Sequence, residues 1–165
     1  MQYHSDDNYS TLATEAKATE YGIRGFPSIY FDGGNLLVGG SDSSYDQQTT
    51  VINKELAKTP SVAIVASMNT SADMAISATV GNTSTSAVLN AKLYVVIYED
   101  LGLSEHHFTV RDIVAPVTVS NLSPGVSQQF NAVSSYSGSK SNLKAVVYLK
   151  ASNGEILQAA LAAVS

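Results

Sequence analysis

The spacing of apolar residues changes near Pro60, and this change divides the chain into two parts. After the proline, apolar residues recur at every second position in short segments, of which Val62–Ala66 and Met74–Val80 are the first. Alternation of this kind is typical of strands with one buried face. Before the proline, short apolar runs alternate with stretches of helical spacing. The sequence therefore predicts an α+β fold, with a mixed part at residues 1–60 and an all-β part at residues 61–165.

The all-β part continues with further alternating segments at Leu93–Ile97, Leu143–Leu149 and Leu157–Leu161. Clusters of Gly, Asn, Asp, Ser and Pro separate the segments and indicate turns. Roughly seven short strands at near-regular spacing within about 100 residues are typical of an antiparallel sandwich. We therefore expect two packed sheets in this part of the chain.

The mixed part contains two helix signals. Ser10 or Thr11 is placed to cap a helix that runs to about Glu20. The apolar positions of this first helix are Leu12, Ala13, Ala16 and Tyr21. A second helix is expected to start at Ser43 or Ser44 and to end before Pro60. Its apolar stripe is predicted to be Tyr45, Thr49, Ile52 and Leu56.

Between these helices lies the run from Tyr21 to Gly34, which combines a helix end, a proline and a glycine turn. Ser28–Phe31 is expected to form a strand that pairs with Leu36–Val38 across the turn. The residue order Tyr-Gly-Ile-Arg-Gly-Phe-Pro-Ser resembles the cis-proline loop of the thioredoxin fold. The resemblance implies a cis bond between Phe26 and Pro27, and a Phe26 backbone that pairs with an extended peptide.

The resemblance covers only the C-terminal half of a thioredoxin-like unit, because about twenty residues precede the run and a βαβ unit is missing. The chain contains no cysteine, so a Cys-x-x-Cys redox site is excluded from these residues. Without that site, the simpler expectation is that Pro27 serves the fold alone. We expect the uncovered half-unit to be covered by upstream residues, by a protein partner or second copy, or by the sandwich.

The all-β part carries its own resemblance. The segments Val80–Val96 and Asn121–Phe130, with an Asn-Thr-Ser turn and a Leu-Ser-Pro-Gly-Val-Ser turn, resemble bacterial immunoglobulin-like adhesion and stalk modules. The combination of both parts resembles the twenty-eight-kilodalton outer-membrane-protein family of exported bacterial lipoproteins. In that family a thioredoxin-like domain precedes a β-sandwich. The resemblance implies a protein of the bacterial envelope, in the periplasm or attached to the outer membrane or cell surface.

One surface of the predicted sandwich is a candidate interface. If Leu93, Val95 and Ile97 face the core, the residues between them point to the opposite face. The same alternation holds on a second strand, which is the neighbour of the first in an immunoglobulin-like order. The candidate interface patch consists of Tyr94, Val96, Tyr98, Val146 and Tyr148. We expect it to dock the thioredoxin-like part or a partner chain; a shift of register would instead place its tyrosines in the core.

Several classes of function are disfavoured. The net charge of −5 and the absence of a basic stripe argue against nucleic-acid binding. No apolar run is long enough for a transmembrane segment, and no signal peptide is visible after Met1. No nucleophile–base set, phosphate loop, cofactor motif or metal site is recognisable. The residues considered and set aside as metal ligands are His4, Asp6, Asp7, Asp42, Asp46, His106 and His107.

We therefore expect a non-catalytic, exported binding or structural protein of the cell envelope that forms an oligomer or a complex. One alternative is the C-terminal fragment of a thiol–disulfide oxidoreductase whose cysteines lie upstream. Another is a surface-adhesion or carbohydrate-binding module, which is based on the sandwich alone.

Overall fold

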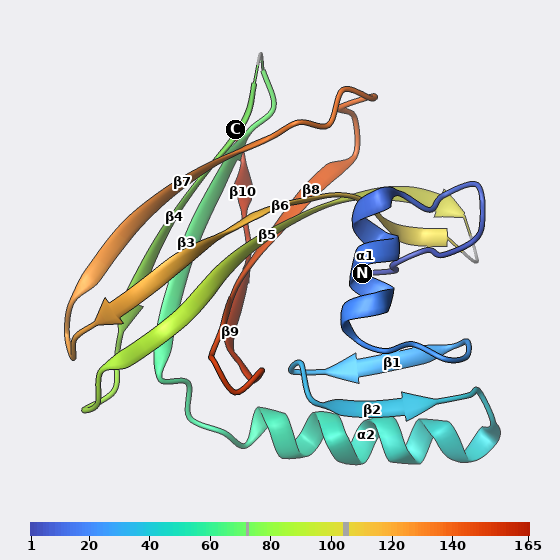
Figure 1. The fold of residues 1–165 in the computed structure, drawn as a ribbon, viewed down its shortest axis with the longest axis horizontal. Coiled ribbons are helices and arrows are strands. Elements are labelled where there is room, and N and C mark those ends of the chain that lie inside the picture. The colour runs from blue at the N-terminus through green and yellow to red at the C-terminus, as the bar shows by residue number, and fades with distance from the viewer. Residues whose placement is uncertain (72, 104–105) are drawn as a thin grey trace.

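The computed structural model describes residues 1–71, 73–103 and 106–165. The first part of the chain contains α1 (Leu12–Glu20), β1 (Ser28–Phe31), β2 (Asn35–Val38) and α2 (Asp42–Leu56). The second part contains β3 (Val62–Asn69), β4 (Met74–Asn82), β5 (Val88–Leu103), β6 (His106–Leu122), β7 (Ser127–Ser134), β8 (Leu143–Lys150), β9 (Ile156–Leu161) and β10 (Ala163–Val164). Figure 1 shows the sheets at one end of the molecule and the helices with the β1–β2 hairpin at the other.

The second part consists of two four-stranded sheets, with strand orders β10-β3-β4-β7 and β6-β5-β8-β9. All neighbouring strands are antiparallel except β10 and β3. The inward side chains of both sheets form one hydrophobic core. Its members include Met68, Ile76 and Val80 from one sheet and Leu93, Ile97 and Leu149 from the other. The predicted alternating segments at Val62–Ala66, Met74–Val80, Leu93–Ile97 and Leu143–Leu149 supply this core, as expected for strands with one buried face. The prediction for Leu157–Leu161 is wrong in part, since Leu157 packs against the core but Leu161 is 59% exposed and Ala162 is buried instead.

The strands β5 and β6 are unusually long, at 16 and 17 residues. Their pairing contains register shifts between Leu93 and Val95, between Ile97 and Tyr98, and beyond Asp100. Such irregularities interrupt the period of two, which explains why no strand was predicted from the pattern of residues 106–122. Every residue from Leu93 to Tyr98 is buried, so this stretch of β5 is covered on both faces.

Helix α1 begins at a capping box in which Thr11 and Thr14 bond each other's backbone, in agreement with the predicted cap. The side of α1 that faces the protein is different from the prediction. Thr14 and Lys17 are buried, whereas Leu12 is 92% exposed. Lys17 can occupy the inward face of α1 because its ammonium lies over the ring of Tyr94 and pairs with Glu20.

Helix α2 begins at Asp42, one or two residues before the predicted start at Ser43 or Ser44. Its predicted apolar stripe is wrong as a buried face, since Tyr45 is 74% exposed and Leu56 is 78% exposed. The less exposed positions of α2 are Ser44, Gln48, Val51 and Glu55. Within the part of the chain that the structure describes, the sheet next to α2 is the β1–β2 hairpin, which has two strands. Such a sheet is too small to bury a whole helix face.

Candidate functional site

The five residues of the candidate interface patch lie together on the outer face of the β6-β5-β8-β9 sheet. Tyr94 pairs with Tyr148 and Val96 pairs with Val146 across β5 and β8, so the expected adjacency of these strands is confirmed. Together with Val110, the buried members Tyr94, Val96, Tyr98 and Tyr148 form a second hydrophobic cluster, with Val146 packed against it. We call this set the aromatic cluster.

The N-terminal segment and α1 cover the aromatic cluster within the same chain. Tyr3 packs against the cluster. Gln2 joins β6 as a parallel bridge, its N–H donating to Phe108 O at 2.7 Å and its O accepting from Val110 N at 3.0 Å. From α1, the Lys17 ammonium lies 4.6 Å from the centroid of the Tyr94 ring, a cation–π geometry. The patch is therefore buried by the first part of the chain.

Ion pairs close the edge of this contact. The Glu20 carboxylate accepts from Lys17 Nζ at 2.8 Å and from Lys150 Nζ at 3.1 Å, so it links α1 to the end of β8. Burial opposes the charge on Glu20, but the hydrogen bonds from the two lysines outweigh it and lower the pKa of this carboxyl. Burial also raises the pKa of Tyr94 and, more strongly, that of Tyr148. Both phenols therefore stay neutral in the packed cluster.

The cis-proline loop leads into β1, and the Phe26–Pro27 peptide bond is cis. The Phe26 side chain is 66% exposed. Gly39 N donates to Pro27 O at 2.8 Å, which fixes Pro27 as a residue whose backbone points toward β2. Since hydrogen-bonded and non-bonded positions alternate along an antiparallel pair, the backbone groups of Ser28 and Tyr30 point away from β2. They form an outer edge of the two-stranded sheet.

Side chains hold this loop in place. Tyr30 OH donates to Tyr21 O at 2.8 Å, and the rings of these two tyrosines lie 4.5 Å apart. Ser28 Oγ donates to Gly25 O at 2.6 Å. At the far end of β1, Asp32 O accepts from Ile156 N at 3.1 Å, so β9 occupies the edge there. Among the described residues, no backbone bond to the outward groups of Ser28 or Tyr30 is found.

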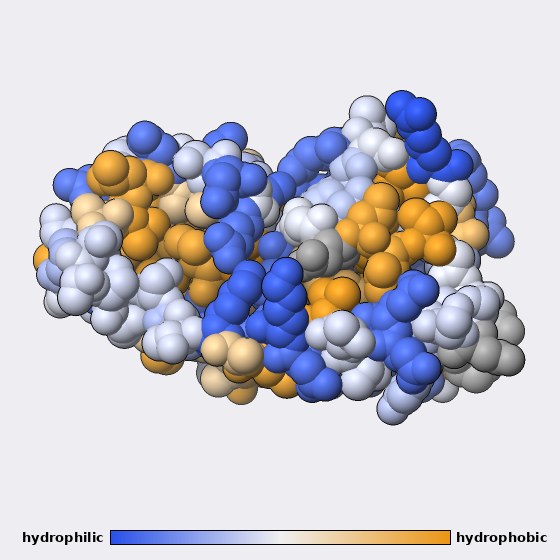
Figure 2. Space-filling view, turned by 90° about the horizontal axis from the view of Figure 1, so that it is seen from below, coloured by the Kyte–Doolittle hydropathy of each residue, from blue (hydrophilic) through white to orange (hydrophobic). Residues whose placement is uncertain are grey.

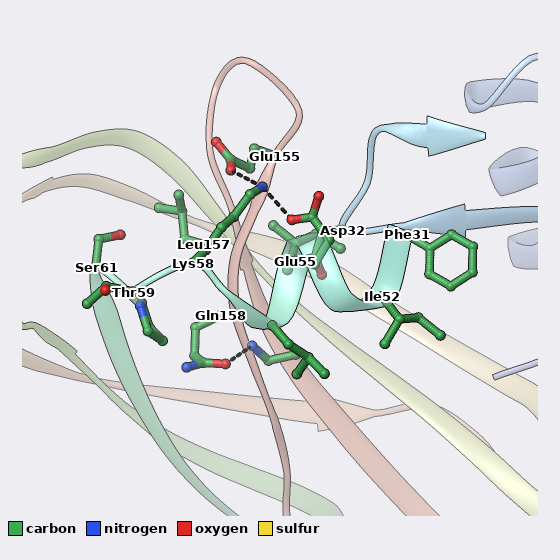
Figure 3. A pocket seen from close by; sticks show the side chains of 14 residues that line it. Phe31, Asp32, Ile52, Glu55, Lys58, Thr59, Ser61, Glu155, Leu157 and Gln158 are labelled. Atoms are coloured by element: carbon green, nitrogen blue, oxygen red, sulfur yellow. Dashed lines mark hydrogen bonds and ion pairs between the residues drawn. The ribbon is translucent and has the colours of Figure 1, made fainter. Parts of the chain in front are cut away.

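A pocket of about 430 Å³ lies where α2 and the hairpin turn meet β9 (Figure 3). Its walls include the apolar side chains of Phe31, Ile52 and Leu157. Its charged side chains are Asp32, Glu55, Lys58 and Glu155. No sequence motif pointed to this group, because its members come from three separate regions of the chain. The 97 positions between Lys58 and Glu155 show how far apart they are in sequence.

Hydrophobic side chains are also exposed on the side of α2. Figure 2 shows two such areas, separated by hydrophilic side chains. The exposed apolar residues of the hairpin region and α2 are Phe26, Leu36, Val38, Tyr45, Ile52 and Leu56. Exposed apolar side chains also occur on the sandwich, for example Val65, Val133 and Leu161, so apolar exposure is not confined to this part of the molecule.

The residues considered as metal ligands lie apart or have other partners. His4 Nδ1 lies 2.6 Å from Asp7 Oδ2, and its ring contacts Tyr9 and His106. His107 instead lies near Asp100, at 3.6 Å. Within residues 1–71, 73–103 and 106–165, no group of three or more His, Asp or Glu side chains is arranged to hold a metal ion. Over the same residues, no helix has the length and apolar character needed to cross a membrane.

No protein-family model and no curated protein sequence matches the chain. Among solved structures, it is similar to a domain of the outer membrane lipoprotein Omp28 from Porphyromonas gingivalis, at 15% identity and a TM-score of 0.44 over 66% of this chain and 91% of that one. It is also similar to a β-glucosidase from Listeria innocua, at 14% identity and a TM-score of 0.36 over 64% of this chain and 16% of that one. A third is the putative ApaA protein from Bordetella pertussis, at 10% identity and a TM-score of 0.33 over 64% and 94%. Likenesses this distant do not define a function.

Proposed function

We propose that this chain is a non-catalytic binding or structural module of the bacterial cell envelope, and that its first part is completed by a strand from another polypeptide. The observation that carries this proposal is the outer edge of β1. The backbone groups of Ser28 and Tyr30 point away from β2, and the apolar side chains of Phe26 and Val38 are exposed nearby. A polypeptide that adds a strand to this edge would satisfy the backbone groups.

The size of the hairpin sheet supports the same proposal. Two strands alone are marginally stable in water, and three or more, or packing on a helix, are needed for independent stability. The less exposed side chains of α2 include the polar Ser44 and Gln48, so the helix adds little apolar packing to the hairpin. An added strand would extend the sheet to three strands. This reading also fits the thioredoxin-like resemblance of the Tyr21–Gly34 run.

The strand order supports an immunoglobulin-like assignment for the second part. Counted along the sandwich, its first, second, fifth and eighth strands share one sheet, and its third, fourth, sixth and seventh strands share the other. Sandwiches of this kind serve as spacers and platforms. The low content of charged residues, at 14%, and the exported family that the sequence motifs resemble support a place in the envelope.

Site-specific crosslinking in a bacterial host tests the proposal. A photo-crosslinking amino acid in place of Val38 should yield a product with one defined polypeptide in the envelope fraction. The same amino acid in place of Val65, which is 74% exposed on β3, is the matched control and should not. Ser28→Pro removes an outward N–H without removing a bond to β2, so it should keep the fold and abolish the product. Equal crosslinking at both positions, or a product insensitive to Ser28→Pro, would contradict strand addition.

An insulin-reduction assay tests the non-catalytic part of the proposal. The chain has no cysteine, so thiol–disulfide turnover above buffer is not expected from residues 1–165. Measurable turnover by the purified chain would overturn this part of the proposal and leave the crosslinking result unaffected.

A further inference from the structure

The pocket of Figure 3 lies at the junction between the two parts of the chain and combines apolar with charged side chains. Phe31 and Ile52 line it on the side of the hairpin and α2, and Leu157 lines it on the side of β9. Its volume of about 430 Å³ lies within the range of small-molecule sites, which often occur where two parts of a protein meet. The pocket is therefore large enough for a compact organic ligand.

Water reaches the apolar wall that α2 contributes. Ile52 is 42% exposed, and Leu56 in the last turn of α2 is 78% exposed. Both belong to the predicted apolar stripe of α2, which the chain itself does not bury. A hydrocarbon group that covered these side chains would remove apolar surface from water, which is favourable. The apolar part of a ligand thus has a surface to bind.

The charged side chains of the pocket are negative in sum. Lys58 Nζ pairs with the Glu55 carboxylate and lies 3.0 Å from Glu155 Oε1. Asp32 contributes a third carboxyl group to the lining. Three carboxylates and one ammonium leave a formal charge of −2 when all four groups are ionised. The side chain of Glu155 is 43% exposed, so a ligand can still reach this carboxylate.

The end of α2 adds to the negative potential. The helix ends at Leu56 and is followed by its C-cap residue Ala57. The carbonyl groups of the last turn of a helix carry the negative end of its dipole, which favours cations within about one turn. Glu55, Leu56 and Lys58 line the pocket at this end. Since Lys58 balances only part of the charge, the pocket favours a further cation.

We propose that this pocket binds a small organic cation, with a primary ammonium at one end and a short apolar body at the other. The ammonium donates hydrogen bonds to the carboxylates of the pocket, foremost to that of Glu155, which it shares with Lys58. The apolar body lies against Ile52, Leu56 and Leu157. An anion of the same shape would instead meet three carboxylates and be repelled.

A titration of the purified chain with 2-phenylethylamine, followed by the NMR signals of its backbone amides, tests the proposal. The amides of Lys58, Leu157 and Gln158 should shift together and reach saturation. The neutral 2-phenylethanol has the same apolar body without the charge, so it should bind at least about tenfold more weakly. The anion 3-phenylpropionate should give no saturable shift at these amides.

Variants of the charged residues locate the ammonium. Glu155→Gln removes one carboxylate and should weaken 2-phenylethylamine by about tenfold, with the affinity for 2-phenylethanol unchanged. Lys58→Gln removes the competing ammonium, so it should tighten 2-phenylethylamine by about twofold to fivefold. Damage to the fold would weaken binding in both variants, and the opposite signs therefore separate the two causes. Asp46→Asn removes a negative charge from an exposed part of α2 and should change the affinity by less than about twofold.

Three results would overturn the proposed site. The first is a titration in which the amides that line the pocket do not shift to saturation. The second is an affinity for 2-phenylethanol equal to that for 2-phenylethylamine. The third is a Glu155→Gln variant that is folded by circular dichroism and binds the amine as tightly as the wild type, or no more weakly than Asp46→Asn. The crosslinking test of strand addition at Ser28 is independent of all three, because the pocket does not include the outer edge of β1.

Discussion

Tyr94 on β5 and Tyr148 on β8 are direct cross-strand partners, and their rings stack with centroids 5.0 Å apart and 8° between the planes. This stack lies beneath α1, where Lys17 covers the Tyr94 ring. It therefore joins the two strands to each other and the sandwich to the first part of the chain.

Removal of a stacked ring should destabilise the whole chain. Tyr148 is 4% exposed, so Tyr148→Ala should lower the free energy of unfolding by about 3 kcal/mol or more. A double-mutant cycle with Tyr94→Ala should give a coupling of about 0.5–1.5 kcal/mol beyond simple burial. Urea unfolding measures both quantities. Tyr45→Ala, at a position that is 74% exposed, is the control and should change stability by less than about 0.5 kcal/mol. Equal losses in the two single variants would show that α1 does not bury the ring in solution.

Glu20→Gln should reduce the sensitivity of the chain to acid. The pKa of Glu20 is lowered in the folded state, so its contribution is present above about pH 4.3, its unperturbed value, and is lost as pH falls through the folded-state pKa. The variant lacks this contribution at every pH. Its stability should therefore be lower than that of the wild type at pH 7 and similar at pH 2–3, as measured by urea unfolding. Asp46→Asn affects neither lysine, so the difference between its free energies of unfolding at pH 7 and at pH 2–3 should equal that of the wild type. If the same difference were also unchanged in Glu20→Gln, the bridge from α1 to β8 would not contribute to stability.

Asn82 should be essential for the loops at one end of the sandwich. It is buried, and its Nδ2 donates to Ser86 O and to Leu122 O, both at 2.8 Å. Its Oδ1 accepts from Ser84 N and Ser84 Oγ. Asn82→Ala leaves the buried carbonyl of Leu122 without this partner, together with the less buried Ser84 N and Ser86 O, at a cost of about 1–3 kcal/mol by urea unfolding. Asn121→Ala, the same change at an exposed position, should cost little, and a similar cost for both would argue that the Asn82 bonds are replaced by water.

Gly33→Ala should lower the stability of the chain and Gly34→Ala should not, although the two glycines are neighbours. At Gly33 the backbone φ is 76° and a Cβ atom would meet the backbone of Gly154, so the alanine should cost about 1–3 kcal/mol. At Gly34 no atom lies within 4 Å of the added Cβ, and φ is outside the left-handed region. Thermal unfolding and the exchange rate of the Ile156 amide measure the effect. If both variants keep the rate of the wild type, the hairpin turn is not seated on β9.

The sequence predicts those strands of the fold in which buried and less buried side chains alternate. The alternation in β4 and β8 identified the core side chains, and it also placed Tyr94 and Tyr148 on a shared outer face. It did not identify β6, because register shifts against β5 remove the alternation there. Nor did it indicate that Lys17 would be buried, since burial of a lysine depends on a ring and a carboxylate from other segments.

The charged group at the pocket lay beyond sequence reasoning for a similar reason. Lys58 and Glu155 meet only after the sandwich has folded and brought the β8–β9 turn to the end of α2. The exposed apolar stripe of α2 is a case in which the sequence pattern predicted burial and the structure does not show it. Its apolar spacing predicts a buried face, but the described residues hold only two strands for the helix to pack on. Periodicity identifies a surface that needs a partner and does not say where the partner comes from.

Several contacts that tie the first part of the chain to the sandwich lie in one short region, in addition to those that Gln2, Tyr3 and Lys17 make with β6 and the aromatic cluster. Lys150 at the end of β8, Gly154 and Glu155 in the turn, and Ile156 at the start of β9 hold α1, the hairpin and α2. A force applied to a polypeptide bound at the β1 edge would therefore act on the contacts at this turn. The covalent chain through Pro60 would still connect the two parts after these contacts broke. For a module anchored to a surface, the contacts at the β8–β9 turn and those of α1 with the aromatic cluster would together set the force at which the two parts separate.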